Sequence, residues 1–223
     1  MTMERTMLVA AVAAGLLFTL LPQLDLALTG LFFDPVRGFP ANDSPWVVAI
    51  YRGVPIATRV LVVGLMIGLI FSLTANLVRR SAAIRTRCAQ LAFLLTAIVL
   101  GPGLIIDVGL KDHWGRARPA QVQEFGGTRQ FTPALQPTSE CPDNCSFVSG
   151  HAAFGYQLIA LAYLGDARRR RRWLIIALLA GSLLGLLRIA QGAHFLSDIA
   201  FSFFFTWLGS WAAYLIWRRA LVK

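Results

Sequence analysis

The sequence predicts an all-α integral membrane protein, a single domain over residues 1–223 built as a bundle of six transmembrane helices. Hydrophobic residues make up 57% of the chain and charged residues only 14%, and the mean hydropathy of +0.63 exceeds that of soluble domains. A hydrocarbon core about 30 Å thick requires roughly 20 apolar residues per helix. The candidate spans are residues 7–31, 55–77, 89–110, 149–165, 173–189 and 195–217.

The first candidate span has the least defined end, because Gln23 and Asp25 interrupt it. Arg5 followed by the apolar run 7–22 is compatible with a signal peptide. However, no small-x-small cleavage site with a polar continuation follows, since LDLALTGLFF stays apolar. We therefore expect this segment to be retained as a membrane span.

The connection between the first two spans, residues 34–54, predicts turns followed by a helix. DPVRGFP contains two prolines and a glycine, which indicates turns. Ser44 followed by Pro45 is typical of a helix start and opens PWVVAIYRGV. We expect this helix to lie along the membrane surface, with an extension of the second span as the alternative. In the third span, Gly101-Pro102-Gly103 predicts a kink.

Most basic residues fall on one side of the six-span arrangement. The net charge is +10, and by the positive-inside rule the basic side, with both termini, is cytoplasmic. The five-arginine run is interpreted as a topology signal beside anionic lipid, so no nucleic-acid partner is expected. The residues on this side are Arg5, Arg79, Arg80, Arg85, Arg87, Arg168–Arg172, Arg218, Arg219 and Lys223.

The cysteines allow one disulfide. Cys141 and Cys145 lie in the outer loop after the third span, where an oxidising exterior favours a bond between them. A C-x3-C metal half-site is the alternative, although the chain offers no second pair to complete it. Cys88 lies at the cytoplasmic face and is expected to remain a thiol.

Three polar segments interrupt the apolar pattern, and the six-span arrangement places all of them at the outer surface. KDHWGRARP (111–119) follows the third span, SFVSGH (146–151) begins the fourth, and RIAQGAHFLSD (188–198) joins the last two. A lone histidine near a membrane is commonly an interfacial residue, but histidines that converge with several cations indicate a site. Each segment holds one of the chain's three histidines, His113, His151 and His194.

The cations in these segments lack matching acids and therefore indicate an anionic ligand. The nearby carboxylates have other partners, because Asp198 lies four residues beyond His194 and Asp107 four before Lys111, on shared helix faces. A carboxylate bonded to one imidazole nitrogen fixes the tautomer and raises the nucleophilicity of the other. Phosphate matches such cations, which also stabilise the charge that builds in phosphoryl transfer. The cations are Lys111, Arg116, Arg118 and Arg188.

The same residues resemble the signature of the type 2 phosphatidic acid phosphatase (PAP2) superfamily: K-x6-RP, then SGH, then R-x5-H-x3-D. The resemblance covers the third to sixth spans, and the first 100 residues match only in layout. Two departures are Val148, where the family has a proline, and Leu187, where it has a serine. The matching residues are Lys111, Arg118, Pro119, Ser149, Gly150, His151, Arg188, His194 and Asp198.

The resemblance implies a metal-independent phosphatase with no cofactor, whose catalytic motifs lie within residues 111–198. It implies that His194 attacks phosphorus to give a phosphohistidine, with Asp198 orienting the imidazole. His151 would protonate the leaving oxygen and later help to activate water. Arg116 and Asp107 are additional candidates for the site. The phosphate-binding residues implied are Lys111, Arg118, Arg188, Ser149 and Gly150.

A site at the outer leaflet suits a lipid phosphate whose tails remain in the bilayer. KDHWGRARP, EFGGTRQF and CPDNCSFVSGH resemble bacterial lipid A 4'-phosphatase-like members, which implies an inner-membrane protein with its site facing the periplasm. Undecaprenyl diphosphate and phosphatidylglycerophosphate are the alternative substrates. A transporter or channel is less favoured because the second, fourth and sixth spans carry almost no polar residues through their depth. Expected partners are the lipid phosphate and membrane lipids, with no obligate protein partner.

Overall fold

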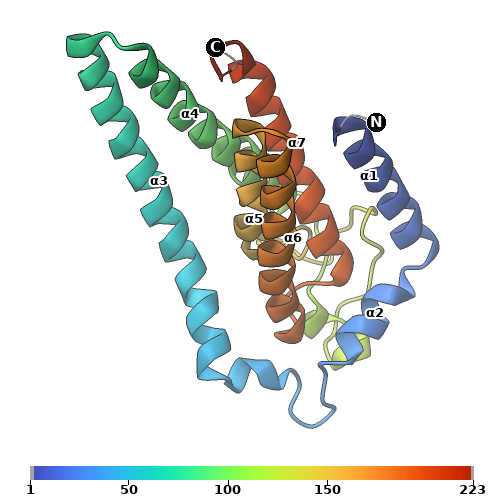
Figure 1. The fold of residues 1–223 in the computed structure, drawn as a ribbon. Helices are drawn as coiled ribbons and strands as arrows, with labels where there is room; N and C mark the ends of the chain where they lie inside the picture. Colours follow the sequence, from blue (N-terminus) through green and yellow to red (C-terminus); the bar gives the residue numbers. More distant parts are fainter. Residues whose placement is uncertain (1–2, 222–223) are drawn as a thin grey trace.

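The computed structural model describes residues 3–221, and this part of the chain is helical (Figure 1). Within it no strand forms, although two isolated bridges pair Asp34 with Gly38 and Val122 with Arg129. The main helices are α1 (Met3–Leu20), α2 (Gln23–Gly30), α3 (Pro45–Arg79), α4 (Ala82–Ile98), α5 (Gly150–Tyr156), α6 (Ala167–Ala190) and α7 (Leu196–Leu221). The shorter or irregular helices are η1 (Pro40–Asp43), η2 (Val99–Leu110), η3 (Pro119–Gln121), η4 (Gln123–Phe125) and η5 (Gln157–Leu164).

Five helices in the described range are long and apolar enough to cross a membrane: α1, α3, α4 continued by η2, α6 and α7. The predicted six-span count is therefore not confirmed. The fourth candidate, 149–165, forms α5 and η5, which together end at Leu164 and are shorter than the other spans. This segment packs against α6 and α7, and most of its residues are buried.

The first candidate span, 7–31, is two helices rather than one. The α1 helix ends at Leu20, and α2 begins after Pro22, as expected where a proline removes a backbone donor. The polar residue that interrupts the apolar pattern, Asp25, is fully buried on α2. It turns toward α7, where it finds the partners described below.

No separate surface helix precedes the second span. Pro45 begins α3, which continues for 35 residues to Arg79, so the alternative of an extended second span describes the structure better. Figure 1 shows that the first turns of α3 nevertheless run at a steep angle to the remainder. Pro55 lies inside the helix, and an interior proline is a recognised cause of such a bend.

The predicted irregularity around Gly101-Pro102-Gly103 is present. The α4 helix gives way at Val99 to the wider helix η2, which contains Pro102, and at its end the Lys111 N–H donates to the Ile106 carbonyl five residues earlier, at 3.0 Å. A Cβ at Gly209 would lie 2.3 Å from the Gly101 Cα. This glycine therefore lets α7 approach η2 closely, and α7 also packs against α4, α5, α6 and η5.

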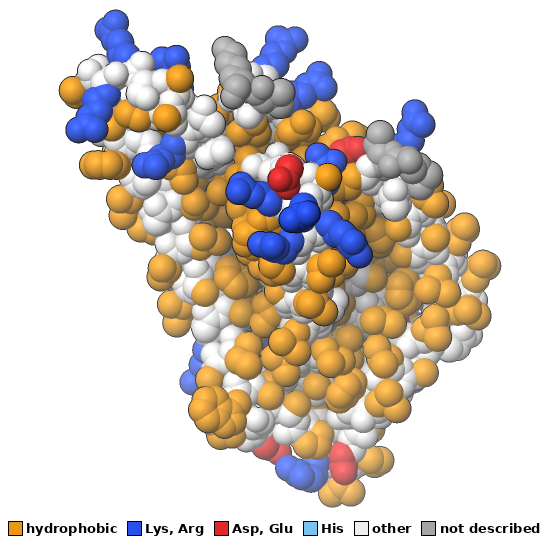
Figure 2. All heavy atoms as spheres, in the orientation of Figure 1, with side chains coloured by type: hydrophobic (Ala, Val, Ile, Leu, Met, Phe, Trp, Pro, Cys, Tyr) orange, Lys and Arg blue, Asp and Glu red, His pale blue; other side chains and the backbone are white. Residues whose placement is uncertain are grey.

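Both described ends of the chain lie at one end of the bundle (Figure 1). Lysine and arginine side chains gather at the same end (Figure 2). The α6 helix begins there at Ala167, where the Asp166 side chain accepts the Arg169 N–H at 2.8 Å as an N-cap. Hydrophobic side chains cover the middle of the molecule (Figure 2), as expected for a surface that faces lipid.

Candidate active site

Lys111 directly follows the last residue of η2, at the end of the helix that lies beside the site. Its ammonium forms an ion pair with Asp107 at 3.3 Å, as the i,i+4 spacing predicted. A Cβ added to Gly150 would lie 3.0 Å from the Lys111 Nζ, so the first two motifs meet here. His113 has a different environment, since its Nδ1 lies 3.0 Å from the Val108 carbonyl and its side chain is exposed.

The loop between Lys111 and Gly150 is held by a ring stack, a backbone hydrogen bond and a disulfide. Trp114 stacks on Phe147 with ring centroids 4.7 Å apart, and the Cys145 N–H donates to the Lys111 carbonyl at 3.0 Å. Cys141 and Cys145 form a disulfide, as the sequence favoured, and Cys88 is a free thiol.

His151 lies in the first turn of α5, after the N-cap Ser149, whose Oγ accepts the Ala152 N–H at 3.4 Å. Its imidazole stacks on Tyr51 of α3, with centroids 5.0 Å apart and planes inclined by 19°. The His151 Nε2 also lies 3.1 Å from the Tyr51 carbonyl oxygen. Tyr51 therefore orients His151 from a helix outside the three motifs.

His194 lies in the turn between α6 and α7, and only 2% of it is exposed. Its Nδ1 lies 2.7 Å from the Ser146 carbonyl oxygen and 3.7 Å from Asp198 Oδ2. Both neighbours only accept hydrogen bonds, so Nδ1 carries the proton and Nε2 keeps a free lone pair. Burial, reinforced by the cations Arg188 and Arg118, lowers the pKa of His194 to about 4. The imidazole is therefore neutral and nucleophilic at neutral pH.

Asp198 is held by more partners than the sequence indicated. Its Oδ1 accepts from Arg116 Nη1 at 2.6 Å, and its Oδ2 accepts from Ser146 Oγ at 2.5 Å and from the Phe195 N–H at 2.7 Å. Ser146 thus contacts both members of the pair, through its carbonyl to His194 and its hydroxyl to Asp198. The expected contact between His194 and Asp198 is present, but at 3.7 Å it is longer than the contact of the same Nδ1 with the Ser146 carbonyl at 2.7 Å.

Arg116 has acidic partners, which corrects the expectation that it is a cation without matching acids like Lys111, Arg118 and Arg188. Its side chain is fully buried and forms ion pairs with Asp25 at 2.8 Å and with Asp198 at 2.6 Å. Its Nε donates to the Thr132 carbonyl at 2.9 Å, and its guanidinium lies 4.4 Å from the Phe195 ring centre. These contacts leave Arg116 no position from which to bind a ligand directly.

Arg118 and Arg188 remain available to an anion and line one cavity of about 410 Å³. Arg118 donates to the Asn144 carbonyl at 2.6 and 3.2 Å. The Arg188 guanidinium lies 4.4 Å above the Tyr51 ring centre, and its Nη1 donates to Gln191 at 2.5 Å. The buried Nε–H of Arg188 has no hydrogen-bond partner within residues 3–221. An unpaired buried donor on a cation favours a bound anion.

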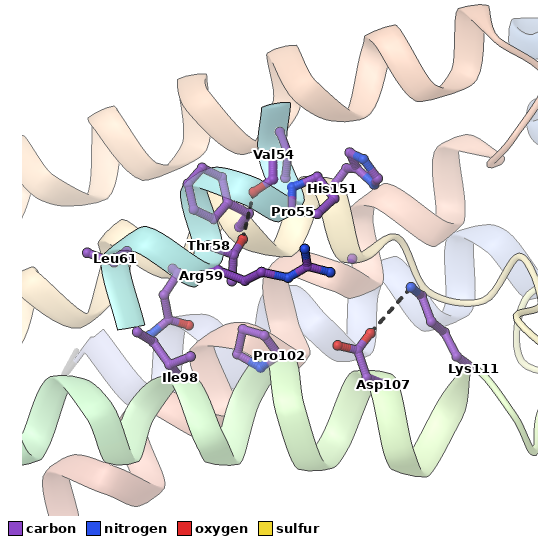
Figure 3. Close-up of a pocket in the computed structure, with 13 residues that line it drawn as sticks. Val54, Pro55, Thr58, Arg59, Leu61, Ile98, Pro102, Asp107, Lys111 and His151 are labelled. Atoms are coloured by element: carbon purple, nitrogen blue, oxygen red, sulfur yellow. Dashed lines mark hydrogen bonds and ion pairs between the residues drawn. The ribbon is translucent and has the colours of Figure 1, made fainter. Parts of the chain in front are cut away.

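His151 lines a second cavity, of about 280 Å³ (Figure 3). Lys111, Gly150 and His151 line it together with Arg59 of α3, which extends toward the space beside Asp107 and Lys111. The remaining wall is mostly apolar and is formed by side chains of α3, α4, η2 and α5. These are Val54, Pro55, Leu61, Ile98, Pro102 and Phe154.

Several residues of this region were not predicted from the sequence. Tyr51 and Arg59 come from α3, Asp25 from α2 and Ser146 from the loop before α5. The sequence offered a sign of Asp25 and Arg59, since both are charged residues in apolar segments, where each requires a partner. It offered no comparable sign of Tyr51 and Ser146. Among residues 3–221, no three histidine, cysteine, aspartate or glutamate side chains lie in a group able to hold a metal ion.

The fold and this cluster define a helical membrane protein with a cationic, histidine-containing site at one end of its bundle. The chain belongs to the PAP2 superfamily, whose family model matches residues 89–221. No solved structure gives a significant match.

Three relatives carry the name lipid A 4'-phosphatase. The protein of Francisella tularensis subsp. novicida is 32% identical over 217 residues, covering 95% of this chain and 94% of the relative. That of Rhizobium leguminosarum is 38% identical over 126 residues, or 56% of this chain and 52% of the relative. That of Rhizobium etli is 40% identical over 125 residues, or 56% and 47%.

Proposed function

We propose that the protein is a membrane lipid phosphatase that removes a phosphate from lipid A, as the names of its relatives indicate. The observation that carries the chemistry is the environment of His194. Its Nδ1 faces two acceptors, and the Nε–H of Arg188 in the same motif has no hydrogen-bond partner within residues 3–221. A neutral nucleophile near cations that keep a donor free suits attack on a phosphate monoester or a diphosphate.

The proposed reaction has two steps. The His194 Nε2 lone pair forms a bond to phosphorus while the bond from phosphorus to the lipid oxygen breaks, and His151 gives a proton to that oxygen. Water then attacks the phosphohistidine, His151 accepts a proton from it, and the nitrogen–phosphorus bond breaks to release phosphate. Each transfer of a proton by a positioned side chain contributes typically about 10²–10⁴-fold.

The phosphate is proposed to lie between the two cavities, beside His151. The guanidinium groups of Arg118 and Arg188 reach it from one cavity and the Lys111 ammonium from the other, with the Ser149 hydroxyl and the Gly150 N–H as further ligands. Asp107 holds Lys111 at 3.3 Å. These side chains supply the positive charge that a metal ion supplies in other phosphatases, so we propose metal-independent catalysis.

An apolar slot supports a lipid as the substrate. The cavity that contains Lys111 shares Leu61, Ile98, Phe154 and Gln157 with a neighbouring space of about 200 Å³. That space is lined by α3, α4, α5, η5 and α6, and nearly all of its lining is apolar. A tail could therefore extend from the phosphate between these helices, where burial of apolar surface stabilises binding.

We further propose six membrane crossings, with α5 and η5 as a short fourth crossing inside the bundle. This segment runs between the same two ends as α6 and α7 (Figure 1), so successive helices alternate in direction. The positive-inside rule then puts the basic end in the cytoplasm. Both termini include residues outside the described range, Lys223 among them. The site would open on the periplasmic face of the inner membrane, without an obligate protein partner.

The experiment is a comparison of purified protein and His194→Ala with a panel of lipid phosphates, measuring released phosphate with and without EDTA. Lipid A is expected to be the best substrate, His194→Ala inactive, and EDTA without effect. Preference for undecaprenyl diphosphate or phosphatidylglycerophosphate would replace the proposed substrate. Loss of activity in EDTA that divalent ions restore would contradict metal independence. Absence of phosphate release from every lipid would favour a transporter instead.

A further inference from the structure

Asp25, Arg116 and Asp198 form a continuous chain of charged groups inside the protein. Arg116 Nη2 donates to Asp25 Oδ2 at 2.8 Å, and Arg116 Nη1 donates to Asp198 Oδ1 at 2.6 Å. None of the three side chains is more than 1% exposed. Asp25 lies on α2, outside the segment that the family model matches.

Ser197 connects Asp25 to the start of α7. The Ser197 N–H donates to Asp25 Oδ1 at 2.8 Å, and its hydroxyl donates to Asp25 Oδ2 at 2.5 Å. The Ser197 oxygen also accepts from Arg116 Nη1 at 2.8 Å. Because Ser197 precedes Asp198, Asp25 fixes both the backbone and the guanidinium that hold the Asp198 carboxylate.

The charges of this chain do not cancel. Two carboxylates share one guanidinium, which leaves a net charge of about −1, and electrostatic interactions are strong where water is excluded. If Asp25 were neutral, Arg116 would pair with Asp198 alone and neutralise it. With Asp25 charged, the guanidinium is shared, and a negative charge remains 3.7 Å from His194 Nδ1.

We infer that Asp25 is a positioning residue for phosphoryl transfer, because it shares Arg116 with Asp198 and so preserves a negative charge beside His194. The inference rests on the proposed function. When the neutral His194 forms its bond to phosphorus and the lipid oxygen departs, the ring retains its Nδ1 proton and becomes positive. The excess negative charge stabilises this ring and the transition state that leads to it.

The test is acid-quenched rapid mixing with labelled lipid phosphate, which gives the rate and amplitude of phosphoenzyme formation. For Asp25→Asn we expect the phosphorylation rate to fall about 10- to 100-fold, as for other residues that orient a reacting group. The apparent KM should stay unchanged because the phosphate ligands are intact. The burst amplitude counts folded sites, so the rate per site is independent of any loss of folded protein.

Thr29→Val is the matched control. Thr29 lies one turn further along α2 and is as fully buried as Asp25, and its hydroxyl has no hydrogen-bond partner within the described residues. This variant disturbs the same helix without changing the charge, so its phosphorylation rate should equal that of the wild type. Equal rates for Asp25→Asn and Thr29→Val would overturn the inference.

The double variant Asp25→Asn/Arg116→Gln separates charge from packing. Neutralising both partners leaves Asp198 as the one charged member, which restores the net charge of about −1. It should therefore phosphorylate faster than Asp25→Asn, and should show a burst even if Asp25→Asn does not fold. A double variant that is no faster, or that shows no burst, refutes the inference.

The two proposals fail in distinguishable ways. A wild-type protein that releases no phosphate from any lipid phosphate refutes the proposed function. A wild-type protein that turns over through a phosphoenzyme, but whose rate is insensitive to Asp25→Asn, refutes only the role of Asp25.

Discussion

The Nδ1 of His194 lies 2.7 Å from the carbonyl oxygen of Ser146, a full ångström closer than the Asp198 carboxylate at 3.7 Å. A backbone carbonyl cannot donate a proton, so it fixes the imidazole tautomer whatever the state of the carboxylate. The Ser146 hydroxyl in turn donates to Asp198 at 2.5 Å. One residue just before the second motif therefore organises both His194 and Asp198 of the third.

This arrangement predicts a moderate effect for Asp198→Asn. Where a carboxylate alone fixes the tautomer, its amide variant loses about 10⁴-fold in kcat. Here the Ser146 carbonyl still holds the Nδ1 proton, so the variant loses the charge and one acceptor oxygen but keeps the tautomer, and we expect a decrease of about 10²-fold. Steady-state kcat with a lipid phosphate measures it, with the amount of folded protein as the control. A decrease near 10⁴-fold would show that Asp198 alone fixes the tautomer.

Arg59→Gln is expected to weaken substrate binding. Arg59 is exposed on α3, and it lines the cavity that also contains Lys111 and His151. A cation in an apolar helix that faces such a cavity indicates an anionic ligand group. The apparent KM for the lipid substrate should rise about tenfold, the energy of one charge-assisted hydrogen bond, with kcat nearly unchanged. Arg79→Gln removes a charge from the far end of the same helix and should change neither parameter.

How much of the site was predictable follows from the sequence separation of the contacts. The pair Asp107–Lys111 lies four residues apart at the end of η2, so helical periodicity placed these two residues together. His194 and Asp198 have the same spacing, but His194 lies in the turn before α7, so they meet because they are close in the chain and not because they share a helix face. The contacts of Arg116 with Asp25 and Asp198 span 91 and 82 residues. Its position near other cations in the sequence therefore suggested a phosphate ligand, although packing buries it against two carboxylates.

The fold was predictable to a similar degree. Apolar length identified the long helices, because a bilayer demands about 20 apolar residues. It left the end of the first candidate span open at Gln23 and Asp25, but it did not anticipate that the chain would break at Pro22 into two helices, since apolar residues resume at Leu26. Nor does apolar length show that the segment 150–164 lies inside the bundle, because a short buried helix and a short membrane span have the same composition.

The disulfide is expected to steady the phosphate site. It encloses Asn144, whose carbonyl accepts two hydrogen bonds from Arg118. Mass spectrometry of protein kept from reductant should find Cys141 joined to Cys145 and Cys88 alkylatable. Cys141→Ser/Cys145→Ser should raise the apparent KM severalfold, as a looser Asn144 carbonyl releases Arg118, while Cys88→Ser leaves it unchanged. An unchanged KM in the double variant would show that the Cys141–Cys145 disulfide contributes to stability and not to phosphate binding.

The proposed orientation predicts opposite labelling at two exposed positions. Thr128 lies in the loop between η4 and α5, and Arg170 lies in the five-arginine run that begins α6. In a Cys88→Ser background, Thr128→Cys should react with an impermeant maleimide added to intact inner-membrane spheroplasts. Arg170→Cys should react only after the membrane is permeabilised. The reverse pattern would place the proposed site in the cytoplasm.

The roles of the two histidines are separable by the leaving group. His194→Ala removes the proposed nucleophile, so no phosphoenzyme forms and turnover vanishes. His151→Ala keeps the nucleophile but loses proton transfer, which is worth about 10²–10⁴-fold. An aryl phosphate that the site accepts has a stable leaving group that requires little protonation. His151→Ala should therefore recover phosphorylation with it, and phosphoenzyme should accumulate because the activation of water remains impaired.

The structure adds a reason to expect this separation. The His151 Nε2 and the His194 Nδ1 are held by carbonyls of different elements, Tyr51 of α3 and Ser146 of the loop before α5. Replacing one imidazole therefore leaves the support of the other intact. Acid-quenched rapid mixing with labelled aryl and lipid phosphates measures both variants. If the better leaving group rescued them equally, or if His194→Ala formed a phosphoenzyme, the nucleophile would be another residue, because a variant without the attacking nitrogen cannot become phosphorylated there.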